Sequence, residues 1–119
     1  MTGYIVFAHG SRIESANEAV RSAADALART GGFSHVQPAF LELGQPDLPG
    51  AVSRLVAAGV DRIVVIPYFL TLGIHMERDL PALIQNISNE YNGLEIAVTS
   101  PLDGHPGLIQ ALLDRATDA

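Results

Sequence analysis

The sequence has 119 residues, of which 48% are hydrophobic and 17% are charged. A chain of this length is expected to form one domain, residues 1–119, with enough buried surface for a stable core. Thirteen acidic residues against seven basic ones give a formal net charge of −6, which argues against nucleic acids and anionic membranes as partners. There is neither an apolar run of the roughly 20 residues that a membrane helix needs nor a signal-peptide pattern, so we expect a cytoplasmic protein.

Two residue types with reactive side chains are absent from the sequence. It contains no Cys, which excludes disulfides, thiolate zinc sites, cysteine-ligated iron–sulfur clusters and cysteine nucleophiles. It also contains no Lys, since all the basic residues are Arg, and this excludes ordinary pyridoxal phosphate enzymes and the lysine of a P-loop.

Strand-like and helix-like segments alternate along the chain. In chain order we expect a strand at Tyr4–Ala8, a helix at Ile13–Thr30, a strand at Val36–Leu41, a helix at Leu48–Ala58, a strand at Arg62–Phe69, a helix at Met76–Glu90, a strand at Leu94–Thr99 and a helix at Pro106–Ala116. This alternation predicts an α/β fold of three layers (α/β/α) around a four-stranded parallel sheet. We expect the strand order 2-1-3-4 with right-handed crossovers.

Three residues with reactive side chains follow three of the predicted strands. His9 follows the first strand, Glu42 the second, and His75 comes shortly after the third. In an open parallel sheet, functional groups collect at the carboxyl ends of the strands. Two imidazoles and one carboxylate at that edge would bind a divalent metal and leave coordination positions open for chemistry.

Each of these residues also has a purely structural explanation. His9, beside Gly10, is either a ligand or a turn residue bonded to a neighbouring carbonyl group. Glu42 lies among apolar residues, where it either serves the site, caps a helix or pairs with an arginine. His75 either faces the site or caps the helix that follows it.

The segments around these three residues predict a binding pocket. Backbone N–H groups and a guanidinium converge where the first helix begins, and the loop at 69–74 is apolar although exposed, as loops that line ligand pockets often are. An arginine in the third helix is either a surface residue or an anchor for a substrate carboxylate. The residues that we expect to contact a ligand are Ser11, Arg12, Phe69, Leu70, Thr71, Gly73 and Arg78.

Six segments of the sequence form a pattern that is similar to a known family. They are Ala8-His9-Gly10-Ser11-Arg12, Phe40-Leu41-Glu42, Ile66-Pro67-Tyr68-Phe69-Leu70, Gly73-Ile74-His75, Asp79-Leu80-Pro81 and Pro101-Leu102-Asp103-Gly104-His105-Pro106. Together they resemble the class II tetrapyrrole chelatases, and most of all the small sirohydrochlorin chelatases of the CbiX/SirB type. The resemblance extends over nearly the whole chain.

The resemblance implies a chelatase, a lyase that inserts Co²⁺ or Fe²⁺, or Ni²⁺ in one branch, into sirohydrochlorin during cobalamin or siroheme synthesis. It implies that His9, Glu42 and His75 are the metal-site and catalytic residues. The divalent metal would be a substrate, and no organic cofactor is expected. Because chains of this length have one of the two lobes of larger members, the resemblance also implies a homodimer.

The residue types suit metal insertion on chemical grounds. The reaction strips water from the metal and removes two pyrrole protons, and imidazole both binds Co²⁺ or Fe²⁺ and exchanges protons near neutral pH. We take His75 as the principal base. Two other functions suit the same residues: a metal-dependent hydrolase with a two-His, one-Glu site, and a tetrapyrrole or metal carrier without catalysis.

Overall fold

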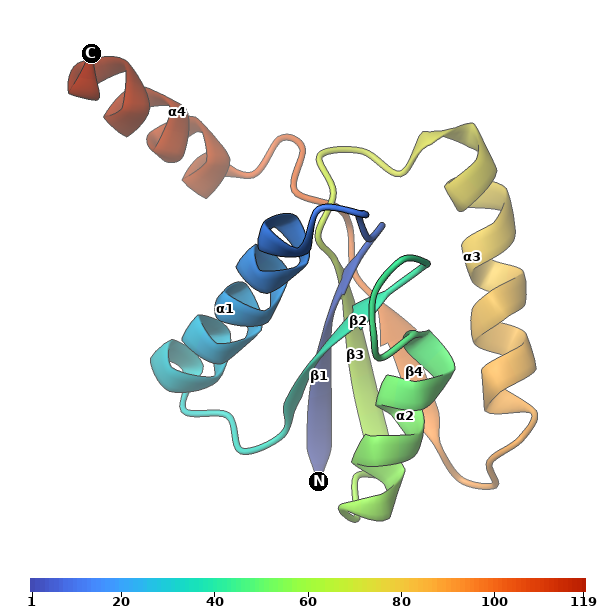
Figure 1. Cartoon of the computed structure of the whole chain (residues 1–119). Coiled ribbons are helices and arrows are strands. Elements are labelled where there is room, and N and C mark those ends of the chain that lie inside the picture. The colour runs from blue at the N-terminus through green and yellow to red at the C-terminus, as the bar shows by residue number, and fades with distance from the viewer.

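The computed structural model describes residues 1–119 and has eight elements of secondary structure. In chain order they are β1 (Thr2–Ala8), α1 (Glu14–Gly31), β2 (Val36–Phe40), α2 (Leu48–Ala57), β3 (Arg62–Pro67), α3 (Gly73–Ser88), β4 (Glu95–Val98) and α4 (Pro106–Asp118). All strands are parallel and lie in the order β2-β1-β3-β4 (Figure 1). The predicted α/β fold and strand order are therefore confirmed.

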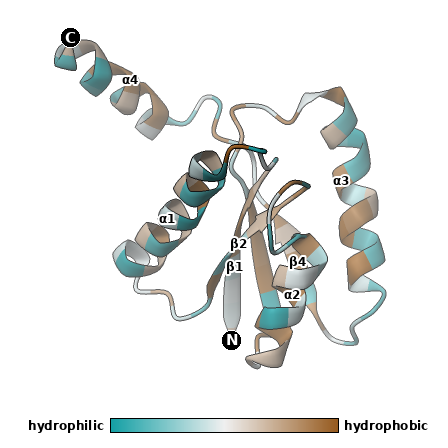
Figure 2. Ribbon diagram, in the orientation of Figure 1, coloured by the Kyte–Doolittle hydropathy of each residue, from teal (hydrophilic) through white to brown (hydrophobic).

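The helices cover the two faces of the sheet unequally. Because side chains alternate along a strand, Ile5 and Phe7 of β1 point toward α2 and α3, whereas Val6 and Ala8 point toward α1. The larger buried cluster lies on the α2 and α3 side, and apolar residues are concentrated along the strands (Figure 2). The three layers are thus α1, the sheet, and α2 with α3.

Local sequence signals fix where the helices begin and end. The carboxylate of Asp47 caps α2 by accepting a hydrogen bond of 2.8 Å from the Gly50 N–H, and Gly32 ends α1 with a left-handed backbone. The main difference from expectation is in α3, which begins at Gly73 instead of Met76; Gly73 has a φ of +75°, a left-handed backbone at which the loop turns into the helix. His75 therefore lies in the first turn of α3; the other element ends coincide with the predicted ones or differ by one or two residues.

The last helix is separate from the core. No residue of α4 is buried, and the helix projects away from the sheet beyond the end of β1 (Figure 1). Its side chains Ile109, Leu112 and Leu113 are 59%, 61% and 57% exposed. No helix of the structure is long and apolar enough to cross a membrane.

Replacing Leu55 of α2 should test the larger core cluster. Leu55 is 2% exposed and packs on the sheet, so Leu55→Ala should lower the free energy of unfolding by about 2–5 kcal/mol through lost burial and a residual cavity. Urea unfolding at fixed protein concentration measures the change. Arg54→Ala, at the exposed neighbouring position of the same helix, is the control and should change stability little; equal losses in both variants would contradict this packing.

Candidate active site

The pairing of β1 with β2 continues past the ends of both strands. The Leu41 N–H donates to the Ala8 carbonyl oxygen at 2.9 Å, and the Glu42 N–H donates to the His9 carbonyl oxygen at 3.1 Å. These bonds bring His9 and Glu42 together at the carboxyl edge of the sheet. Their side chains meet with 3.4 Å between Nε2 of His9 and Oε1 of Glu42, yet they are 58% and 59% exposed. The pair is therefore open to a ligand, and Glu42 is paired with His9 instead of with an arginine.

Gly10 allows the two loops to approach each other. Its φ is +96°, and a Cβ atom at this position would lie 1.7 Å from the Glu42 carbonyl oxygen. No other residue fits between the loops without moving the Glu42 backbone, since both the space and the left-handed conformation exclude a side chain. The glycine after His9 is thus a condition for the contact between His9 and Glu42.

A buried amide holds the same two loops from behind. Asn17 of α1 is 2% exposed. Its Nδ2 donates to the carbonyl oxygens of Ser11 and Leu43, both at 2.8 Å, and its Oδ1 accepts from the Ser11 N–H at 2.9 Å. The sequence analysis missed Asn17, although its spacing from Val20 and Ala24 places it on the apolar face of α1. A polar residue in a core-facing position was the signal that could have identified it.

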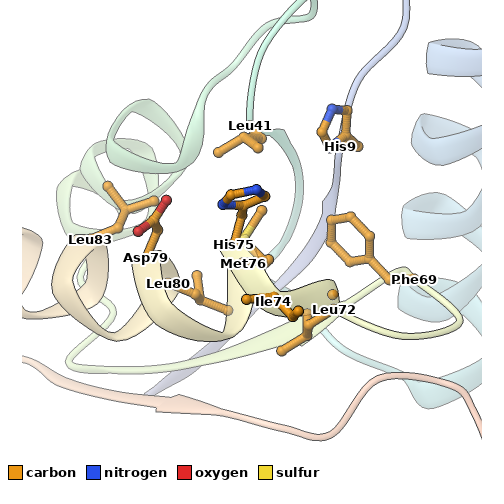
Figure 3. A pocket seen from close by; sticks show the side chains of 11 residues that line it. His9, Leu41, Phe69, Leu72, Ile74, His75, Met76, Asp79, Leu80 and Leu83 are labelled. Atoms are coloured by element: carbon orange, nitrogen blue, oxygen red, sulfur yellow. The ribbon is translucent and has the colours of Figure 1, made fainter.

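An apolar cavity of about 520 Å³ lies between this edge of the sheet and α3 (Figure 3). His9 lies on one side of the cavity, and His75 and Asp79 of α3 lie on the other. The eleven lining residues are His9, Leu41, Phe69, Leu72, Gly73, Ile74, His75, Met76, Asp79, Leu80 and Leu83. The α3 wall follows from helical spacing, since Met76, Leu80 and Leu83 are separated by four and three residues. The cavity suits an apolar ligand that makes polar contacts on both sides.

The predicted ligand-binding residues divide into two groups. Phe69 and Gly73 line the cavity, and the ring of Phe69 stands edge-on to that of His9 with 6.5 Å between centroids. Arg12, Leu70, Thr71 and Arg78 are exposed and are not among the lining residues. Ser11 is occupied within its own loop, because its N–H binds Asn17 and its Oγ accepts from the Ile13 N–H at 3.0 Å.

His75 makes a contact with Arg78 one turn further along α3. Nη2 of Arg78 lies 3.4 Å from Nδ1 of His75, and Nε of Arg78 donates to Oδ1 of Asp79 at 3.0 Å. The hydrogen bond with Asp79 raises the pKa of Arg78 above its usual value. Because a guanidinium has only donors, Nδ1 of His75 is the acceptor in this contact, and the neutral ring then carries its proton on Nε2. His75 is therefore free of a helix-capping role, and α3 begins without a side-chain cap.

The structure does not gather a three-residue metal site. No group of three or more His, Asp or Glu side chains lies in an arrangement that could hold a metal ion. His9 and Glu42 form one pair, and His75 faces the same cavity from α3. His105, which follows β4, accepts a hydrogen bond of 2.8 Å at Nδ1 from the Gly107 N–H and caps α4.

Removing the buried amide should weaken the loops that carry the site. Asn17→Ala leaves two carbonyl oxygens and one N–H in a partly buried region without their partner, which should cost about 1–3 kcal/mol of unfolding free energy. Chemical denaturation measures this loss. Asn86→Ala, at an exposed position of α3, serves as the control and should leave stability nearly unchanged. A stable Asn17→Ala variant would show that the amide does not hold the loops.

Comparisons with known proteins find relatives that align with nearly the whole of this chain. A sirohydrochlorin ferrochelatase from Arabidopsis thaliana chloroplasts is 34% identical over 95% of this chain, which spans only 50% of that relative. A sirohydrochlorin cobaltochelatase of Saccharolobus solfataricus is also 34% identical, over 99% of this chain and 95% of its own length. The solved structure of a CbiX protein from Marinobacter aquaeolei VT8 superposes with a TM-score of 0.87 at 29% identity, covering 99% of this chain and 96% of the other.

The family assignment rests on the extent of the match. The family model described as CbiX matches residues 3–119, which is nearly the entire sequence. The matched region includes all four strands apart from Thr2, the pair of His9 and Glu42, and the wall that α3 gives to the cavity. The chain belongs to the CbiX family.

Proposed function

We propose that this chain is a sirohydrochlorin chelatase, which inserts Co²⁺ or Fe²⁺ into the tetrapyrrole as a step of cobalamin or siroheme synthesis. The observation that carries the proposal is the apolar cavity with the pair of His9 and Glu42 on one side and His75 on the other. Family membership supports it, since relatives that align over this chain are named sirohydrochlorin cobaltochelatase and sirohydrochlorin ferrochelatase. The metal is a substrate in this reaction, and no organic cofactor is proposed.

The proposed pose follows from the chemistry of the ring. A tetrapyrrole is a flat apolar disc with carboxylates at its edge, so its faces suit Leu41, Phe69 and Met76, which line the cavity. Its edge carboxylates would reach the exposed guanidinium groups of Arg12 and Arg78, which lie outside the cavity. Of the remaining predicted contacts, Ser11, Leu70 and Thr71 belong to the loops that surround this pose, and Gly73 begins α3 and lines the cavity.

We assign the metal to the pair of His9 and Glu42 before insertion. Nε2 of His9 and Oε1 of Glu42 lie 3.4 Å apart, so one ion can contact both after a small movement of either side chain. Nitrogen and oxygen donors suit Co²⁺, Fe²⁺ and Ni²⁺ alike. With only two protein ligands close together, most coordination positions remain for water and for the pyrrole nitrogens that replace it. Weak ligation of this kind favours transfer over storage.

We assign removal of pyrrole protons to His75. Its Nδ1 accepts from Arg78 in the structure, so a substrate carboxylate that draws Arg78 away would free the lone pair of Nδ1 for a proton. Binding of the carboxylate and release of the base would then be coupled. Glu42 would compensate the charge of the metal or act as a second base.

The arrangement disfavours the hydrolase alternative. A catalytic zinc ion of a hydrolase is normally held by three protein ligands, and no three such groups come together in this structure. A carrier has the same pocket as a chelatase but gives no acceleration of metal insertion, so rate measurements separate the two.

The active unit that we propose is a homodimer in the cytoplasm, in which each chain, residues 1–119, is one lobe. A single chain offers only two arginines near the rim for a ligand with several carboxylates, and it carries a net charge of −6. A second copy would double that number and add a second wall to a cavity that is open to solvent. The cytoplasmic location stays a prediction from the sequence.

Metal insertion should be visible directly in the absorbance of sirohydrochlorin with Co²⁺ under anaerobic conditions. We expect the protein to accelerate formation of the metallated spectrum, and His9→Ala and His75→Ala to reduce the rate by about 100-fold or more, as expected for lost ligation or proton transfer. His35→Ala, before β2 at the opposite edge of the sheet, is the control and should retain activity. Binding without acceleration would replace the chelatase with a carrier.

Arg78→Gln should separate substrate binding from the later steps. Losing a guanidinium that meets a substrate carboxylate should raise KM by about tenfold, with a smaller change of kcat, since the contact is charge-assisted. Steady-state rates against sirohydrochlorin concentration at low and high salt measure the effect. Arg54→Gln removes an equal charge from α2, outside the cavity, and an identical rise of KM in this variant would indicate only a general loss of positive charge.

A further inference from the structure

Apart from glycines, Leu43 is the only residue with a left-handed backbone, and it directly follows Glu42. Its φ is +57°, whereas every other residue with a positive φ is a glycine. A leucine rarely adopts this conformation, because its Cβ atom then comes too close to the following carbonyl oxygen. Backbone strain of this kind persists only where neighbouring groups hold it, and it is common at functional sites.

Three contacts hold the turn that contains Leu43. The Leu43 carbonyl oxygen accepts a hydrogen bond of 2.8 Å from Nδ2 of the buried Asn17. The Phe40 N–H donates to the Pro46 carbonyl oxygen at 2.9 Å and closes the loop around Leu43. Gly44 rests on the ring of Phe40, where a Cβ atom would lie only 2.8 Å from Cγ. The left-handed conformation is thus held from the core, from the base of the loop and through the following residue.

The side chain of Leu43 does not explain this support. It is 50% exposed, belongs to neither buried cluster and lines none of the cavities. What Leu43 contributes to the site is therefore the direction of its main chain, which turns its carbonyl oxygen inward to Asn17.

The main chain of Glu42 is fixed on both sides. Its N–H donates to the His9 carbonyl oxygen at 3.1 Å, and the carbonyl oxygen of the next residue, Leu43, is bound to Asn17. Its own carbonyl oxygen lies against Gly10, where a Cβ atom would be 1.7 Å away. The main chain of Glu42 therefore has little freedom to move, and its carboxylate reaches Nε2 of His9 from this fixed position.

We propose that Leu43 is a positioning residue, which keeps the Glu42 carboxylate within reach of His9 through its strained backbone and its bond with Asn17. In an extended or right-handed conformation the Leu43 carbonyl group would turn away from Asn17, and the main chain of Glu42 would lose this support. A carboxylate that is already in place loses less conformational freedom when it binds an ion, so the strain at Leu43 favours metal binding. This consequence rests on the proposed function, whereas the positioning of Glu42 does not.

Two substitutions of Leu43 separate a role of its backbone from a role of its side chain. Leu43→Asn introduces a residue that tolerates the left-handed conformation, whereas Leu43→Ile keeps the apolar character but adds a β-branch that disfavours it. Both variants should fold, because the side chain is half exposed. We expect amide hydrogen exchange at the Glu42 N–H, measured by NMR, to accelerate at least about tenfold in Leu43→Ile and less than about twofold in Leu43→Asn.

The Leu41 N–H is the internal reference for these exchange rates. It donates to the Ala8 carbonyl oxygen, closer to the strands, and should exchange at a nearly unchanged rate in both variants. Equal acceleration at Leu41 and Glu42 would indicate general destabilisation of the loop and would overturn the proposal. Faster exchange in Leu43→Asn than in Leu43→Ile would also overturn it, since that order indicates a role of the apolar side chain.

Titration with Co²⁺ alone tests the consequence for the metal. The dissociation constant should be about tenfold larger in Leu43→Ile and within about twofold of the unaltered value in Leu43→Asn. In a chain that already carries Leu43→Asn, Asn17→Ala should raise this constant less than in the unaltered chain, because the left-handed turn then needs less support. Fully additive effects would contradict a joint action of Leu43 and Asn17. An unaltered chain that does not bind Co²⁺ would refute the proposed function, and the exchange rates would still decide whether Leu43 positions Glu42.

Discussion

The site depends on two backbone hydrogen bonds that continue the pairing of β1 and β2 beyond the strands. They hold the loop that contains His9 against the loop that contains Glu42, and this backbone contact brings the two side chains together. Gly10 leaves the space for this approach, and Asn17 binds both loops from the core. The pair thus has a rigid support although its side chains are exposed, which is the combination that a transient ligand site needs.

Helix α3 supplies the other half of the site through ordinary helical periodicity. Its buried residues Met76 and Leu80 attach the helix to the core and at the same time line the cavity, while the exposed His75 also lines the cavity and Arg78 lies outside it. Under the proposed function, metal and proton chemistry are therefore divided between two walls. This division suits metal insertion, in which the ion approaches the ring and the protons leave it, better than it suits a site that retains a metal.

The sequence analysis identified the features that depend on strand pattern. Apolar runs and the alternation of elements predicted the four strands and their order, and therefore predicted that residues following strands 1 and 2 would share one edge. His9 and Glu42 are brought together for this reason. Periodicity could not predict the early start of α3, because the loop and the first helical turn have the same apolar composition.

Other features depend on contacts between segments distant in sequence. Asn17 binds Leu43 across 26 residues, and neither residue alone predicts the bond. The contact between Arg78 and His75 depends on side-chain rotamers, which pattern does not specify. The outward course of α4 depends on backbone hydrogen bonds from Leu102 and Asp103 to the loop after β3. The helix itself was predicted correctly, but its position relative to the sheet was not predicted.

Crystals of the protein grown with Co²⁺, with diffraction measured at the cobalt absorption edge, test the central claim most directly. The account predicts one anomalous peak at bonding distance, about 2.0–2.2 Å, from Nε2 of His9 and from a carboxylate oxygen of Glu42, at the mouth of the cavity that His75 lines. A cobalt ion bound elsewhere on the chain, with the pair of His9 and Glu42 unligated, would contradict the account.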